Sequence, residues 1–126
     1  MLLLDTGPLA MVILGSDRMT KTAREAVLSA DEVMVSAISF YEIGQKVRIG
    51  KWPEMAPFVA ELEALTTKRG ITITPLSASV SLRASLLDWS HRDPFDRMIA
   101  TVALQEGCPV VSPDAAFDAV GVARVW

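Results

Sequence analysis

Short apolar runs alternate along this chain with longer segments in which apolar residues recur every three or four positions. A short run bounded by polar, glycine or proline residues is typical of a buried strand, and the wider spacing is typical of a helix with one buried face. The runs predict five short strands, at residues 1–4, 32–35, 71–74, 109–112 and 122–125.

The segments between these runs carry recognisable helix ends. Pro8 suits a first helical turn, Ser36 is expected to be an N-cap, and Asp93 before a proline is expected to open another helix. Gly50 and Gly70 suit helix C-termini. The predicted helices cover about 8–15, 20–30, 37–50, 54–69, 79–87, 94–106 and 114–120.

Strands and helices therefore alternate from one end of the chain to the other. That order predicts a parallel sheet covered by helices on both faces, which is a three-layer α/β/α fold. No repeat or linker interrupts the pattern, and 126 residues suit one domain, so residues 1–126 are expected to form a single domain.

Composition bears on disulfides, on the cellular compartment and on membrane segments. Hydrophobic residues make up 51% of the chain, which is enough for a core without a disulfide, and the single Cys108 cannot form an internal bridge. We expect Cys108 to be a small buried residue before a strand, in a reducing cytoplasmic compartment. The longest early apolar run, 9–14, is far below the roughly 20 residues of a membrane span, and no signal peptide is recognisable.

The net charge of −3 argues against tight, sequence-blind binding of nucleic acid through a basic surface. It does not exclude an enzyme that acts on nucleic acid, because two bound divalent ions would move the balance to about +1.

Four acids lie at strand ends or in the opening turns of predicted helices. Asp5 comes directly after the first strand, Asp114 comes just after the fourth, and Glu42 and Asp96 lie in the opening turns of helices. Ligands of open α/β sheets bind at the carboxyl ends of the strands, so these acids are expected to meet there. Carboxylates without a thiolate or a histidine pair suit Mg²⁺ or Mn²⁺, and such a site is suited to hydrolysing phosphodiesters.

Each acid also has a structural explanation. Asp5 and Asp114 could cap the turns that follow them. Glu42 precedes Lys46 by four residues, the spacing of a surface ion pair on a helix. Asp96 would favour the dipole of its own helix. Their shared position at one sheet edge is what favours a site.

The neighbouring polar residues leave alternatives open. Asp93 is interpreted first as a helix cap. Arg92 and Arg97 could bind substrate phosphates or pair with the acids, and Thr6 and Ser112 could orient ligands or satisfy turns.

His91, the only histidine, has no partner at metal-ligand spacing and is expected to be exposed or to flank a helix. A basic group on one helix is either a solvated face or a phosphate track: Lys46, Arg48 and Lys51. The tryptophans are expected in the core or an interface: Trp52, Trp89 and Trp126.

Four motifs in order resemble those of the PIN-domain VapC toxins. They are Leu-Leu-Leu-Asp5-Thr6, Ser36-Ala-Ile-Ser-Phe-Tyr-Glu42-Ile-Gly, Arg92-Asp-Pro-Phe-Asp96-Arg97-Met-Ile-Ala-Thr and Val111-Ser112-Pro-Asp114-Ala-Ala-Phe117. The resemblance covers essentially the whole chain, and the Asp-Pro-Phe-Asp-Arg block is its most specific part.

The resemblance implies a PIN-like sheet ordered 3-2-1-4-5 and a Mg²⁺- or Mn²⁺-dependent endoribonuclease. It implies that the metal-binding and catalytic acids are Asp5, Glu42, Asp96 and Asp114, with supporting positions at Thr6, Asp93, Arg97 and Ser112. Gly7 departs slightly from the family, which often has a small polar residue there.

The resemblance further implies a homodimer and a cognate antitoxin that binds an apolar groove. Candidate groove residues are Leu9, Met11, Val12, Leu14 and the predicted helix 20–30, although plain core packing would explain them equally well.

Other functions remain to be weighed. A receiver-like phospho-acceptor domain would need a lysine after its last long strand, and none follows Lys68; a haloacid-type phosphatase would need an aspartate at Gly7. A binding module without catalysis would leave four acids unexplained, and a PIN-fold nuclease acting on DNA remains an alternative.

Overall fold

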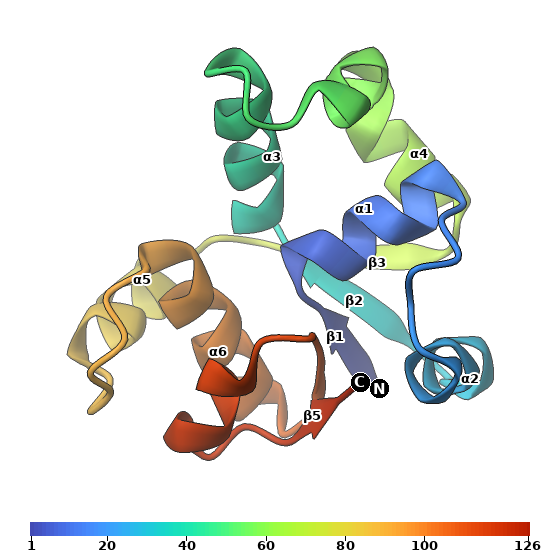
Figure 1. The fold of residues 1–126 in the computed structure, drawn as a ribbon. Helices are drawn as coiled ribbons and strands as arrows, with labels where there is room; N and C mark the ends of the chain where they lie inside the picture. Colours follow the sequence, from blue (N-terminus) through green and yellow to red (C-terminus); the bar gives the residue numbers. More distant parts are fainter.

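The computed structural model describes residues 1–126 and contains one five-stranded sheet, in the order β3-β2-β1-β4-β5 (Figure 1). Every neighbouring pair of strands is parallel. The strands are β1 (Leu2–Leu4), β2 (Val33–Ser36), β3 (Ile71–Thr74), β4 (Val110–Val111) and β5 (Arg124–Val125). The predicted fold class and strand order are confirmed.

Helices cover both faces of the sheet, with α1 and α4 on the opposite side from α5 and α6 (Figure 1). The α-helices are α1 (Thr6–Leu14), α2 (Lys21–Ser29), α3 (Ile38–Arg48), α4 (Leu62–Lys68), α5 (Ala78–Leu86) and α6 (Pro94–Glu106). Two 3₁₀ segments complete the chain, η1 (Pro53–Glu61) and η2 (Ala115–Val120).

The central strand β1 separates two hydrophobic clusters. Leu2 and Leu4 pack with residues of α1, α2 and α4 on one face, while Leu3 packs with α6 and with Phe117 of η2 on the other. Successive side chains of a strand point to opposite faces, so an unbroken Leu-Leu-Leu run is what a strand covered on both sides requires.

Two local predictions need correction. Residues 54–69 were expected to form one α-helix, but Pro57 lies inside the segment, which is 3₁₀ until Leu62. Proline has no N–H to donate and clashes with the preceding turn. Ser36 is the last residue of β2 and not an N-cap, although its Oγ accepts from the Ile38 N–H at 3.3 Å. The short helix predicted after Asp114 is present, as the 3₁₀ segment η2.

Other predicted features are confirmed. Asp93 caps α6 by accepting from the Phe95 N–H at 2.9 Å, and Gly107 ends the helix in the left-handed conformation. Cys108 is buried just before β4. None of the helices combines the length and apolarity that crossing a membrane would demand.

Candidate active site

A polar cavity of about 250 Å³ collects the predicted acids. Parallel order brings the carboxyl ends of neighbouring strands to the same edge, as expected for a ligand site in such a sheet. Asp5 follows β1 directly and Asp114 follows β4, while α3 and α6 supply Glu42 and Asp96. The lining residues are Asp5, Thr6, Gly7, Glu42, Lys46, Trp52, Asp93, Asp96 and Asp114.

Asp5 is buried and held by both carboxylate oxygens. Its Oδ1 accepts from the Thr6 N–H and its Oδ2 accepts from the Ser112 hydroxyl, each at 2.7 Å. Burial raises the pKa of the Asp5 carboxyl, and the charges of Glu42 and Asp114 raise it further, against these two hydrogen bonds. Asp5 is therefore both the N-cap of α1 and a fixed carboxylate in the cavity.

Ser112 links two of the acids. Its Oγ donates to Asp5 and accepts from the backbone N–H of Asp114 at 3.0 Å. The hydroxyl predicted beside the acids therefore orients Asp5 and ties the end of β4 to the end of β1. The Thr6 hydroxyl contacts none of the acids and instead pairs with the Ser39 hydroxyl at 2.9 Å.

Glu42 lines the cavity and also makes the ion pair that the sequence offered as its alternative role. Its Oε2 accepts from Lys46 Nζ at 2.8 Å, so the predicted ion pair exists. Its Oε1 is buried and has no hydrogen-bond partner. A buried acceptor without a partner is costly, and a cation bound in the cavity would remove that cost. Such oxygen donors fit Mg²⁺ or Mn²⁺.

Asp96 has a partner that the sequence analysis missed. His91 Nε2 lies 2.6 Å from Asp96 Oδ2, so the expectation that His91 has no site partner is wrong. Burial raises the Asp96 pKa to about 6, the nearby charges of Asp5 and Asp93 add to this, and His91 opposes it. The available signal was that the only histidine lies five residues before Asp96.

Asp93 keeps its capping role while lining the same cavity. Ligand atoms of His91, Asp93 and Asp96 all lie within 4.8 Å of one another, so this trio has the spacing and the chemistry to hold a cation.

Arg97 neither pairs with the acids nor faces the cavity, which corrects both roles expected for it. Its guanidinium is fully engaged by backbone carbonyl groups of α5 and of the loop before α6. The acceptors are Ala84, Ser85, Leu87, Trp89 and His91, at 2.7 to 3.4 Å. Arg97 therefore fixes the loop that carries His91.

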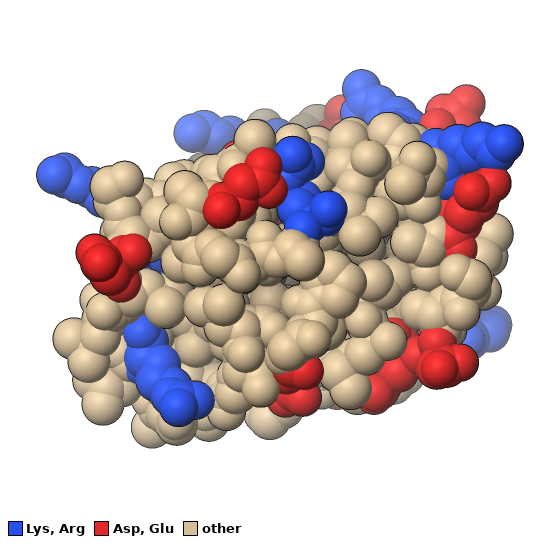
Figure 2. Space-filling view, turned by 90° about the horizontal axis from the view of Figure 1, so that it is seen from below, with Lys and Arg blue, Asp and Glu red and all other residues tan.

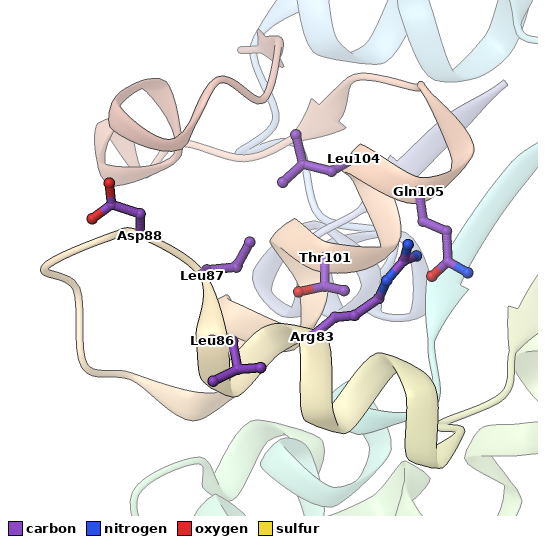
Figure 3. Close-up of a pocket in the computed structure, with 7 residues that line it drawn as sticks. All are labelled: Arg83, Leu86, Leu87, Asp88, Thr101, Leu104 and Gln105. Atoms are coloured by element: carbon purple, nitrogen blue, oxygen red, sulfur yellow. The ribbon is translucent and has the colours of Figure 1, made fainter.

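A larger depression of about 610 Å³ lies between α5 and α6 (Figure 3). Its lining consists of Arg83, Leu86, Leu87, Asp88, Thr101, Leu104 and Gln105. This surface offers one acid and no cluster of converging groups, so the acidic cavity is the better candidate for chemistry. One face of the molecule shows basic and acidic side chains interspersed, without a continuous basic tract (Figure 2).

Comparison with known proteins adds to this geometry. A family model described as PIN domain matches residues 2–123. The chain is 32% identical over 99 residues to Ribonuclease VapC22 of Mycobacterium tuberculosis (strain ATCC 25618 / H37Rv), a match that covers 77% of this chain and 74% of that protein.

Solved structures share the fold at lower identity. FitAcB from Neisseria gonorrhoeae is 21% identical, with a TM-score of 0.67 over 98% of this chain and 96% of that chain. The sarcin-ricin loop cleaving toxin VapC20 of Mycobacterium tuberculosis is 18% identical, with a TM-score of 0.67 over 98% and 97%. A toxin-antitoxin complex from Klebsiella pneumoniae is 13% identical, with a TM-score of 0.58 over 90% and 87%.

Proposed function

Because the chain belongs to the PIN-domain family, we propose that it is a Mg²⁺- or Mn²⁺-dependent endoribonuclease and the toxin of a toxin–antitoxin pair. The observation that carries the proposal is the meeting of Asp5, Glu42, Asp96 and Asp114 in one cavity, with the buried Glu42 Oε1 unpaired. The relative named as a ribonuclease supports the choice of RNA over DNA.

In this proposal the four acids hold the ion. When bound, a divalent cation supplies a water of lowered pKa and offsets negative charge on the phosphodiester. The chain contributes the rest: Ser112 and the Thr6 N–H fix the Asp5 carboxylate, and His91 contacts Asp96. Lys46, at the cavity wall, is the cation placed to meet a substrate phosphate. Attack by water on phosphorus, with the bond to the 3′-oxygen breaking, leaves a 5′-phosphate and a 3′-hydroxyl.

An antitoxin is the proposed protein partner, as in the toxin-antitoxin complex with this fold. An open groove between α1 and α2 is the proposed docking place; its lining includes Met11, Val12, Val27 and Leu28, with the charged residues Asp17, Arg24 and Arg69. Leu9, also expected there, is fully buried and belongs to the core. A homodimer remains part of the proposal.

The test is cleavage of a mixed cellular RNA pool by purified wild-type protein and Asp5→Asn, with Mn²⁺ or with EDTA. Asp88→Asn is the matched control, because Asp88 is an exposed acid outside the cavity. We expect cleavage by wild type and the control with Mn²⁺ only, and a loss of at least 100-fold in Asp5→Asn. Equal cleavage by Asp5→Asn, or cyclic phosphate ends, would contradict the mechanism.

A further inference from the structure

His91 is held in place from two directions. Its ring lies 4.8 Å from the ring of Trp89, which in turn lies 5.9 Å from the fully buried Phe117. Trp89 packs against the hydrophobic cluster on the α6 face of the sheet. The imidazole therefore packs against Trp89, which itself packs against the hydrophobic core.

The backbone beneath His91 is also fixed. Arg97 Nη1 donates to the carbonyl oxygens of Trp89 and His91, at 2.8 and 2.9 Å, and Nη2 donates to that of Leu87 at 2.7 Å. Arg97 follows Asp96 directly in α6. The same helical turn that presents Asp96 to the cavity thus anchors the loop that presents His91 to Asp96.

The contact that results is specific. His91 Nε2 lies 2.6 Å from Oδ2 of Asp96, and Asp96 Oδ1 makes no hydrogen bond. Asp96 lies near the charges of Asp5 and Asp93, which repel a free carboxylate. A partner on one oxygen keeps the side chain facing the cavity and leaves the other oxygen available.

We propose that His91 is a positioning residue, which orients the Asp96 carboxylate so that Oδ1 serves the metal ion. The inference rests on the proposed function, because it assigns Asp96 to the ion. Carboxylates that bind metals are commonly oriented by a further hydrogen bond, and removing that partner typically costs about 10- to 100-fold in metal affinity or activity.

Two substitutions separate hydrogen bonding from packing. His91→Phe keeps an aromatic ring against Trp89 and removes the contact to Asp96. His91→Gln loses the ring and keeps an amide N–H that can donate to Asp96. Ser90→Ala is the control, because Ser90 is an exposed residue of the same loop and its side chain makes no hydrogen bond.

The readouts are Mn²⁺ affinity by calorimetry and the steady-state constants for RNA cleavage. For His91→Phe we expect Mn²⁺ affinity and kcat to fall about 10- to 100-fold while KM for RNA is unchanged. His91→Gln should recover most of both losses, and Ser90→Ala should match wild type. Impaired His91→Gln beside a wild-type-like His91→Phe would show a packing role and overturn the proposal.

A second readout does not depend on loading or turnover. Because His91 is the only histidine, its imidazole nitrogen resonances are identified without assignment. In the metal-free protein, Asp96→Asn should shift the Nε2 resonance strongly and Ser90→Ala should leave it in place. A resonance that Asp96→Asn does not move would overturn the contact.

If wild type binds Mn²⁺ and His91→Phe binds it equally well, only the positioning role fails. If wild type binds no Mn²⁺, both the proposed function and this inference fail.

Discussion

Three of the clustered acids each contact a different side chain. Asp5 accepts from Ser112, Glu42 pairs with Lys46, and Asp96 contacts His91. These contacts compensate only part of the cost of the charged carboxylates, because the pKa values of Asp5 and Asp96 remain raised, chiefly by burial and further by neighbouring acids. The clustered acids therefore cost the metal-free protein stability.

This cost predicts that Asp5→Asn stabilises the metal-free protein at neutral pH. The raised pKa means that folded Asp5 binds its proton more tightly than the unfolded chain does, so the stability it contributes is present at low pH and lost as pH rises through the folded value. Asparagine caps a helix as well as aspartate does.

Urea unfolding in EDTA at pH 4 and pH 8 is the measurement. The free energy of unfolding of Asp5→Asn should exceed that of wild type at pH 8, and the gap should close toward the unfolded pKa of 3.8. A variant less stable than wild type at pH 8 would show that the charge of Asp5 does not destabilise the metal-free protein.

Lys46→Met tests the compensation at Glu42. Removing Lys46 leaves a buried carboxylate with neither oxygen paired, so the metal-free protein should lose about 1–3 kcal/mol in free energy of unfolding. Saturating Mn²⁺ should reduce the deficit, because without Lys46 both oxygens of Glu42 are free for the ion, which then stabilises the variant more than wild type. The double variant Glu42→Gln/Lys46→Met is the control and should show no such Mn²⁺ rescue. A deficit that is independent of Mn²⁺ would separate Glu42 from the ion.

At the scale of helices and strands, hydrophobic spacing predicted most of the structure. The five strands and the capped ends of α6 are local features, and local residues specify them. The apolar spacing of Phe58, Leu62 and Leu65 favoured one continuous helix, although Pro57 lies within that segment. Because proline lacks a backbone N–H and clashes with the preceding helical turn, the segment η1 that contains it is 3₁₀.

Arg97 acts at this same scale, by joining α5, the following loop and α6. Arg97→Met leaves several carbonyl groups without their donor, so the free energy of unfolding should fall by about 2–4 kcal/mol. Amide hydrogen exchange should accelerate in residues 87–93. Arg83→Met is the control, because Arg83 is exposed on α5 and makes no side-chain hydrogen bond. Equal effects of the two substitutions would contradict the anchoring role.

At the scale of the whole molecule, strand order determines which residues meet. Asp5 and Asp114 follow strands, and Glu42 and Asp96 lie in the opening turns of helices, so the four were predictable as a group at the edge where all strands of a parallel sheet end. The roles of His91 and Arg97 were not predictable in this way. Both depend on how the α5–α6 loop folds back onto α6, and hydrophobic spacing carries no information about that path.

Two overlapping groups of side chains share Asp96 in the folded molecule. One comprises the four acids of the cavity, and the other comprises His91, Asp93 and Asp96. The proposed function requires the ion to lie among the four acids, at the ends of β1 and β4. An ion held by the trio would instead displace His91 from Asp96.

Anomalous scattering from crystals soaked in Mn²⁺ distinguishes these positions most directly. We predict a peak within coordination distance of Asp5 and at least one of Glu42, Asp96 and Asp114, and no peak in crystals of Asp5→Asn. A peak on His91, Asp93 and Asp96 alone, or no peak in wild-type crystals, would contradict the four-acid metal site on which the ribonuclease proposal depends.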